Sequence, residues 1–275
     1  MKQLRIILLY AAIIGITILF FFPLYWMIST AFKANNILLK IPPEWFPKEP
    51  ILDNFKAIFM NPDFIGFYKN TIITSTSTTV LCLLISAHAS YSFSRFTFTI
   101  NKVLHMGILV TQMFPGIVLL LSLYMIYRNL GLLNTYTALI LACTTKALPL
   151  SIWMLKGFFD TIPRSIEEAA YIDGAGRLRT LYNVIAPLIK PGVVAVSIYT
   201  FMVTWDDFIY ALTLINRNEM RTLPAGIALA FLGEYGYDWA KIMAASVAAS
   251  IPILLIFVFL QKYMIAGLTA GAVKE

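Results

Sequence analysis

The feature that most constrains the fold of this chain is a series of apolar runs, each long enough to cross a lipid bilayer. A transmembrane helix needs about 20 consecutive apolar residues. Hydrophobic residues make up 59% of the chain and charged residues 13%, whereas soluble domains have about half and about a quarter. We therefore predict an all-α, multi-pass membrane protein with six spanning helices, at Ile6–Ala31, Thr71–Phe93, Val103–Tyr127, Tyr136–Leu155, Gly192–Ile215 and Ala240–Gln261.

Two local features test whether these runs are whole helices. Pro115, Pro149 and Pro252 fall inside predicted spans, and we expect kinks there, because neighbouring helices can satisfy the freed backbone groups. The basic and then apolar N-terminus is similar to a signal peptide. Its apolar run continues to about Ala31 without a small-residue cleavage site, which predicts a retained first helix.

Six crossings place both termini on one side of the membrane. Lys and Arg are slightly more numerous inside when the N-terminus is inside, which favours an N-in/C-in topology. The first outer loop contains four prolines and mixed charge and is predicted to form a small cap. The expected domains are a first helix with outer loop (1–69), a core of five transmembrane helices (70–262) with a cytoplasmic polar loop (157–191), and a tail (263–275).

Several site classes receive no support from the residue pattern. The net charge is +7, but the basic residues are scattered among loops, so we expect no nucleic-acid partner. Cys82 and Cys143 each stand alone in an apolar run, which predicts small buried residues rather than a disulfide or a metal site. His88 and His105 are too far apart in sequence to suggest a metal pair, and we assign no metal and no catalytic residue.

A polar stretch from Glu168 to Pro191 interrupts the apolar chain. Ser165 and Glu168 have capping-box spacing, which predicts a helix start. Asp173–Gly176 breaks that helix, and a second one is expected at Arg177–Ile185, ended by Pro187 and Pro191. Periodicity alone leaves two readings open: an amphipathic hairpin that anchors the protein at the membrane face, or a knob that docks on a cytoplasmic partner.

Charged groups inside the spans are functional candidates, because each costs about 2.5–3.5 kcal/mol on insertion scales. Lys146 and Asp206 both lie about 15 Å from the outer helix ends and could pair. Asp206 and Asp207 point about 100° apart, so at most one is expected to do so. The alternatives are a structural ion pair and a solute path.

Three uncharged groups are further candidates for lining a solute path. Trp205 and Tyr210 offer stacking faces, and Gln112 precedes the Phe114-Pro115-Gly116 sequence. A helix–helix hydrogen bond is an equally good interpretation of Gln112. Gly267 and Gly271 have the spacing of a packing motif, but they follow the last span, so we do not interpret them as a dimer contact.

The polar stretch resembles the coupling loop of ABC importer permeases. The resemblance rests on Glu168-Ala169-Ala170, Asp173-Gly174-Ala175, Ile185 and Pro187, with LKGFFDTIPRSIEEAA around the loop and LTAGAVKE at the end. The flanking segments are similar to the shorter permease of maltose-type sugar importers, and the likeness extends from about Pro23 onward. It implies the type I importer permease fold.

The resemblance also implies roles for the loop residues. Glu168 would meet a basic residue of an ATPase subunit, Gly174 would form the turn that seats the loop, and Ala169, Ala170 and Ala175 would keep the contact surface small. The resemblance further implies that the tail at Gly267–Glu275 reaches the ATPase interface. Many sugar permeases have W-N-E-F where this chain has Trp205-Asp206-Asp207-Phe208, so the identity of the sugar stays open.

We therefore expect a sugar-importing permease subunit in the cytoplasmic (inner) membrane of a prokaryote. Its expected partners are a second permease, two ATPase subunits, an extracytoplasmic binding protein, the sugar and membrane lipid. No phosphate-binding loop is present, so this chain should bind no cofactor, with ATP and Mg on the ATPases. The rivals are a secondary carrier using Lys146, Asp206 and Asp207, and a membrane enzyme, for which no clustered catalytic groups are found.

Overall fold

The chain is helical along nearly all of its length. The computed structural model describes residues 2–97, 99–230, 232–233 and 236–270. Within these residues four helices are long and apolar enough to cross a membrane, or six spans if each of two bent helix pairs is counted as one. The described strands, β1 (Leu232–Gly233) and β2 (Gly236–Tyr237), have only two residues each and form one antiparallel pair. The predicted all-α membrane class is confirmed.

Two compact units make up the chain, and each is described by itself. The first comprises Met1–Ile65 with Gly226–Ile251, and the second comprises Gly66–Ala225 with Pro252–Glu275. The domain boundaries expected from the sequence, at residues 69/70 and 262/263, remain a prediction.

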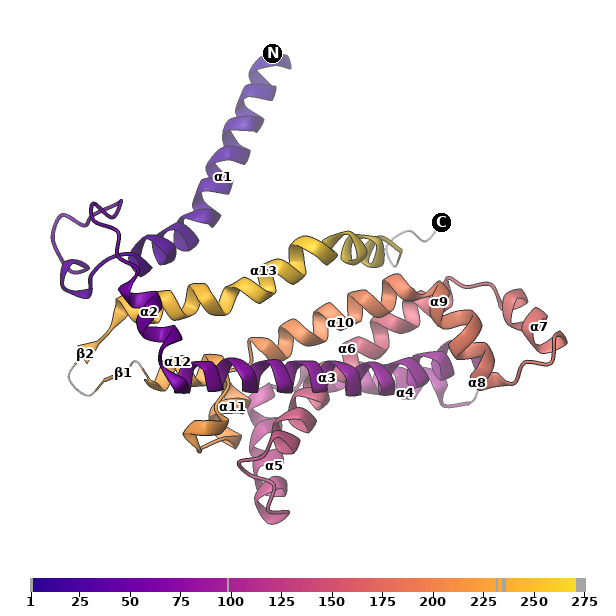
Figure 1. Cartoon of the computed structure of the whole chain (residues 1–275). Coiled ribbons are helices and arrows are strands. Elements are labelled where there is room, and N and C mark those ends of the chain that lie inside the picture. Colours follow the sequence, from indigo (N-terminus) through magenta and orange to yellow (C-terminus); the bar gives the residue numbers. More distant parts are fainter. Residues whose placement is uncertain (1, 98, 231, 234–235, 271–275) are drawn as a thin grey trace. The chain divides into compact units, whose positions relative to one another are not determined.

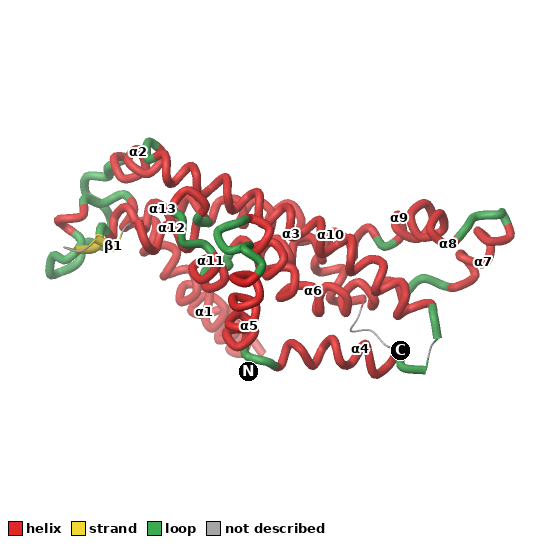
Figure 2. Tube along the Cα trace, turned by 90° about the horizontal axis from the view of Figure 1, so that it is seen from below, coloured by secondary structure: helices red, strands yellow, loops and turns green. Residues whose placement is uncertain are grey.

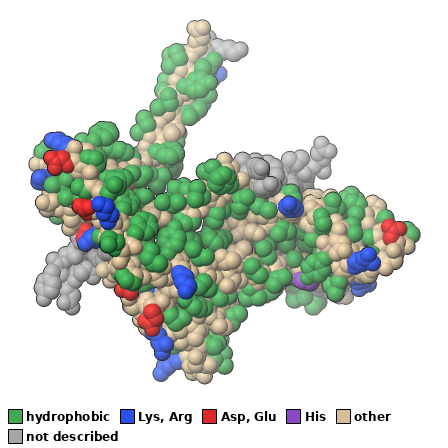
Figure 3. Space-filling model, in the orientation of Figure 1, with side chains coloured by type: hydrophobic (Ala, Val, Ile, Leu, Met, Phe, Trp, Pro, Cys, Tyr) green, Lys and Arg blue, Asp and Glu red, His purple; other side chains and the backbone are tan. Residues whose placement is uncertain are grey.

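The first unit contains the N-terminal helix, the loop that follows it and part of the C-terminal helix. Its elements are α1 (Lys2–Ala31), η1 (Asn35–Ile37), α2 (Asp53–Phe59), the end of α12 (Leu223–Ala230), the β1–β2 ribbon and the start of α13 (Trp239–Ala270). The apolar part of α1 buries none of its residues within the chain, and hydrophobic side chains cover its surface in Figure 3. Such a surface suits lipid or another apolar helix.

The loop after α1 is folded back by hydrogen bonds to the main chain. The buried Asn54 amide donates to the carbonyls of Ala31 and Lys33, at 2.8 and 2.9 Å. Lys33 is buried against Trp26 and donates to the carbonyl of Glu44. Burial lowers the pKa of Lys33, although the nearby Glu44 charge opposes that shift. The loop is thus an ordered cap at the end of α1.

The second unit contains most of the helices (Figure 1). Their bounds are α3 (Pro62–Arg95), α4 (Asn101–Val110), η2 (Thr111–Met113), α5 (Gly116–Asn129), α6 (Tyr136–Asp160), α7 (Arg164–Ile172), α8 (Arg177–Arg179), η3 (Thr180–Ile185), α9 (Ala186–Leu188), α10 (Lys190–Trp205), α11 (Ile209–Leu214) and η4 (Asn218–Met220). Helices α3, α6 and α10 lie side by side in both Figure 1 and Figure 2.

Small polar side chains fill the contacts among α3, α6 and α10. Cys82 lies 3.2 Å from the Ser151 hydroxyl, and Ser151 lies 3.3 Å from that of Thr200. Ser90 donates to the carbonyl of Ile152 at 2.8 Å. Small hydroxyl-bearing residues allow membrane helices to approach closely. Cys82 and Cys143 are both buried and free, as the sequence predicted.

The third predicted span is not one kinked helix. The segment Asn101–Met113 and α5 meet at an angle of 97°, so the expectation of a mere kink at Pro115 is wrong. Phe114 is extended, with φ −76° and ψ 135°, which is the conformation that a following proline favours. Pro149 and Pro252, by contrast, lie within α6 and α13, as predicted.

The fifth predicted span, Gly192–Ile215, is also broken. Helix α10 ends at Trp205, and α11 begins at Ile209. The Asp207 carboxylate accepts the N–H groups of Tyr210 and Ala211. Such local bonds from side chain to backbone compete with a continuous helix. The two aspartates therefore stand in a break between helices, not on one helix as expected.

Candidate functional site

The polar loop folds as a helix, a turn and a second helical run at one end of the second unit (Figures 1 and 2). Helix α7 is followed by α8, the π-helical turn η3 and α9. The second run therefore continues past Pro187, where the sequence predicted its end. Proline is tolerated because it stands in the first turn of α9, where an N–H donor is not needed.

Gly174 forms the turn that the sequence predicted. Its φ is +80°, a left-handed conformation that glycine adopts without steric cost. The N–H of Ala175 donates to the Ala170 carbonyl at 2.9 Å, and the N–H of Gly174 donates to the Tyr171 carbonyl at 3.0 Å. These two bonds are those of a Schellman motif, which ends a helix and satisfies its last carbonyls.

The predicted capping box of Ser165 and Glu168 is wrong. Helix α7 begins at Arg164, so its N-cap is Pro163, and no side chain caps it. The helix therefore starts one residue before Ser165, and both predicted capping residues lie inside it. Glu168 is exposed, and no described residue forms an ion pair or hydrogen bond with its carboxylate.

Exposed residues of mixed character follow Glu168 in the loop. Ala169, Asp173 and Gly174 are exposed beside it. Ile172 is 86% exposed and Leu178 is 65% exposed. Large apolar side chains that stand together on a surface often mark a contact with another protein or with membrane. We call the set Glu168, Ala169, Ile172, Asp173, Gly174 and Leu178 the outer face of the loop.

The opposite side of the loop packs onto the helices of the unit. Leu181 and Ile185 are buried in a cluster with Leu155 and Phe159 of α6 and Tyr91 of α3. Of the residues singled out from the sequence, Ile185 and Ala170 thus lie inside, whereas Pro187 is exposed. Ile185 holds the second helical run against the spanning helices and does not belong to the outer face.

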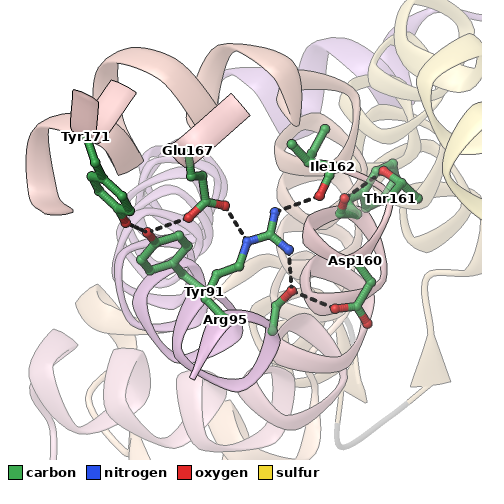
Figure 4. Close-up of polar contacts among 9 residues, drawn as sticks. Tyr91, Arg95, Asp160, Thr161, Ile162, Glu167 and Tyr171 are labelled. Carbon is green, nitrogen blue, oxygen red and sulfur yellow. Dashed lines mark hydrogen bonds and ion pairs between the residues drawn. The ribbon is translucent and has the colours of Figure 1, made fainter. Parts of the chain in front are cut away.

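A buried polar network joins α7 to α3 and α6 (Figure 4). Glu167 forms an ion pair with Arg95 and accepts a hydrogen bond from Tyr91 at 3.0 Å. Arg95 also donates to the Ile162 carbonyl at 2.9 Å. The side chains of Glu167 and Arg95 are each 7% exposed. Sequence reasoning missed both residues, although a second acid directly before Glu168 was a visible signal.

A second polar cluster lies beside the two helix breaks. The Lys146 ammonium lies 2.9 Å from a carboxylate oxygen of Asp207, and their side chains are 41% and 3% exposed. The same ammonium lies 5.4 Å from the centre of the Tyr210 ring. Gln112 donates to the Lys146 carbonyl at 3.1 Å. Lys146 therefore pairs with Asp207, a choice that the sequence left open.

Neither Trp205 nor Asp206 takes part in this ion pair, whereas Tyr210 lies beside it. Trp205 is buried and stacks on Phe201, with ring centres 5.4 Å apart. Asp206 is exposed, and no described residue forms an ion pair with its carboxylate. Tyr210 is buried and donates to the Gly116 carbonyl, 3.4 Å away, just beyond the break at Pro115.

The histidines do not form a metal centre. His88 contacts Tyr182 of the polar loop, with a ring nitrogen 2.8 Å from its hydroxyl, and the His105 ring lies tilted against Phe93, with ring centres 5.5 Å apart. Among the described residues, no group of three or more His, Cys, Asp or Glu side chains could hold a metal ion.

Comparison with known proteins identifies the family. A family model described as "Binding-protein-dependent transport system inner membrane component" matches residues 82–269. The chain belongs to this family. The resemblance seen in the sequence is therefore confirmed. As a permease of the ABC transporter class the chain is a transport subunit and not an enzyme, and ATP hydrolysis is performed by partner ATPases.

Relatives match almost the whole chain. The permease protein SmoH of a sulfoquinovosyl glycerol transport system, from Agrobacterium fabrum, is 38% identical over 92% of this chain and 88% of its own length. The permease protein MalG of a trehalose/maltose transport system, from Thermococcus litoralis, is 36% identical over 98% of this chain and 97% of its own length.

A solved structure has the same fold. A chain of a bacterial ABC transporter involved in the import of the acidic polysaccharide alginate superposes with a TM-score of 0.83. The alignment covers 96% of this permease and 98% of that chain, at 21% sequence identity. The predicted type I importer permease fold is therefore confirmed.

Proposed function

We propose that this permease moves a sugar or an oligosaccharide into a prokaryotic cell across the cytoplasmic membrane. Relatives support the solute class, because their names refer to trehalose and maltose, maltodextrin and galactooligosaccharides. The N-in/C-in topology predicted from charge belongs to this proposal, since it places the polar loop in the cytoplasm. Membership of a binding-protein-dependent family disfavours the alternative of a secondary carrier.

The outer face of the polar loop is the observation that carries the proposal, because it gives an ATPase subunit a surface to dock on. Glu168 offers an exposed carboxylate to a basic residue of the partner. Ala169 and Gly174 are small and leave room for a partner to approach Glu168, and Ile172 and Leu178 add exposed apolar area. A charged group beside small and apolar residues is suited to a specific protein contact.

The proposed complex contains three kinds of protein besides this chain. A second permease completes the pathway, two ATPase subunits bind beneath the polar loops, and an extracytoplasmic binding protein delivers the solute. ATP and Mg bind to the ATPases, and this chain holds no cofactor. The tail at 267–275 is a further proposed contact with an ATPase, but residues 271–275 lie outside the described part of the chain.

Transport in this proposal follows alternating access. Closure of the ATPases around ATP moves the docked loops, and the helices then change from inward-facing to outward-facing. ATP shifts this equilibrium only as far as the ATPases contact one state better than the other.

The cluster of Lys146, Asp207, Tyr210 and Gln112 is the proposed polar part of the solute path in this subunit, with Trp205 and Asp206 as further candidates. The Lys146 ammonium is partly exposed, and Asp207 uses only one of its three hydrogen bonds to hold it. The remaining ammonium donors could bind solute hydroxyl groups.

The test is to purify the tagged chain in mild detergent and identify the proteins that accompany it. A second permease, an ATPase and a binding protein are expected. Glu168→Lys should lower recovery of the ATPase at least about tenfold, because reversing an interface charge costs more than about 1.4 kcal/mol. Asn183→Lys, which adds a lysine at an exposed position of the second helical run, should not. Recovery of the chain alone, with full transport in liposomes, would overturn the proposal.

A further inference from the structure

We propose that Arg95 and Glu167 form a positioning pair, which fixes the orientation of the docking helix and passes its movement to the spanning helices. This inference rests on the proposed docking of the outer face. It assigns different tasks to two adjacent acids, with Glu168 facing a partner protein and Glu167 facing the interior of its own chain.

The pair stands where three segments of the second unit converge (Figure 4). Arg95 is the last residue of α3, Glu167 lies in α7, and Ile162 lies in the turn that connects α6 with α7. Ser94, next to Arg95, donates to Asp160 at the end of α6, at 2.6 Å. Movement of α7 relative to α3 must therefore break or bend the contacts of Glu167 with Arg95 and Tyr91.

The contacts leave little rotational freedom. One oxygen of Glu167 pairs with Arg95 and the other accepts from Tyr91. The Arg95 guanidinium also binds the Ile162 carbonyl and the Ser94 hydroxyl. A planar guanidinium makes bonds in fixed directions, unlike the freely rotating ammonium of lysine. Both ends of the pair are therefore held in direction as well as in distance.

Few side chains of helix α7 are buried, and Tyr171 of the same helix adds a contact with the Tyr91 hydroxyl at 3.3 Å. Glu167 and Ala170 are the residues of α7 that are buried. The second helical run is held differently, through the apolar side chains of Leu181 and Ile185. Apolar contacts tolerate sliding, whereas a hydrogen-bonded ion pair specifies one geometry. The ion pair therefore determines the angle at which α7 presents Glu168.

The test uses the complete transporter, reconstituted in proteoliposomes with its ATPases and its loaded binding protein, and measures solute moved per ATP hydrolysed. Glu167→Gln removes the charge, and Arg95→Lys keeps the charge but loses the planar fork. Each should lower this ratio about tenfold, the upper range for residues that carry coupling. ATPase subunits should remain bound in wild-type amount, because the outer face is intact.

Ser165→Ala, on the same helix as Glu167, is the matched control and should change nothing. Tyr91→Phe, which removes the hydrogen bonds to Glu167 and Tyr171 and no charge, should lower the ratio about twofold, even if the charge variants fail to reach the membrane. An unchanged ratio in Tyr91→Phe, or in membrane-inserted Glu167→Gln, overturns the positioning role.

The outcomes separate this inference from the proposed function. If the unmodified complex lacks an ATPase or ATP-dependent uptake, the proposed function fails. If it transports normally and the variants keep its ratio, only the positioning pair fails. If the variants lose bound ATPase along with transport, the pair acts in docking itself, and the inference is overturned in favour of that role.

Discussion

Replacing Lys146 by Met should destabilise the second unit, because it leaves the buried Asp207 carboxylate without its cation. Asp207 would keep two donors, the N–H groups of Tyr210 and Ala211 at 3.0 and 3.2 Å. Removing one partner of a fully buried ion pair costs about 3–5 kcal/mol, and exposed pairs contribute about 0.2–1 kcal/mol. Lys146 is 41% exposed, so we expect an intermediate loss of about 2 kcal/mol.

A double-mutant cycle measures the interaction directly. Lys146→Met, Asp207→Asn and the double variant would be unfolded reversibly in mixed micelles by increasing SDS, with helix content as the signal. The double variant should be more stable than the sum of the single losses predicts, by about 1–2 kcal/mol. Asp206→Asn is the matched control, since its exposed carboxylate pairs with no described residue, and should change stability by less than about 0.5 kcal/mol.

Two results would refute this reasoning. Additive losses, within about 0.5 kcal/mol, would mean that Lys146 and Asp207 do not interact in the folded protein. A non-additive cycle between Lys146→Met and Asp206→Asn would mean that Lys146 interacts with Asp206, whereas the structure pairs it with Asp207.

Three further perturbations have definite expected outcomes. Gly192→Ala should lower the free energy of unfolding by about 1–3 kcal/mol, since the new Cβ would lie 2.4 Å from the Phe158 ring. Thermal unfolding should show this loss of stability, and the additional substitution Phe158→Ala should reduce it. Gly174→Val should leave the chain in the membrane but abolish ATP-driven uptake, because φ +80° is strained for valine; a transport assay with a membrane-fraction blot checks both. Asn54→Ala should lower the free energy of unfolding by about 1–3 kcal/mol, because the carbonyls of Ala31 and Lys33 at the end of α1 lose their donor. Limited proteolysis of the first outer loop should become faster.

The existence of the spanning helices was predictable because each apolar run is long. Length and hydropathy alone indicated Ile6–Ala31 and Tyr136–Leu155, and the structure has helices there. The glycine turn was also predictable, because only glycine adopts a positive φ readily in that setting. These features depend on local chemistry, so a single sequence contains enough information to predict them.

The two helix breaks were not predictable in the same way. Pro115 and Pro149 are equivalent in a proline count, yet one ends a helix and the other does not. What differs is the surroundings: Pro115 is followed by Gly116, whose carbonyl accepts a bond from Tyr210 far along the chain. A contact between distant segments therefore stabilises the break, and local propensity does not contain it.

The breaks and the ion pair belong to one arrangement. Asp207 accepts two backbone N–H groups at the start of α11, and it pairs with Lys146, whose carbonyl binds Gln112 beside the other break. Unpaired charge in the interior of a bilayer is costly. In a continuous helix these N–H groups would bond to backbone carbonyls. The break lets them bond to Asp207, and these hydrogen bonds offset part of the free-energy cost of burying its carboxylate.

The adjacent acids of α7 show the limit of sequence reasoning most clearly. Glu167 and Glu168 are chemically identical, and successive helix positions point about 100° apart, so the two side chains cannot both reach the same partner. Which of them turns inward depends on Arg95, a residue of another helix. Arg95 stands 72 residues before Glu167 in the chain, so no local pattern contains this contact. The capping box predicted for Ser165 considered only bonds within α7, and it therefore gave no reason to distinguish Glu167 from Glu168.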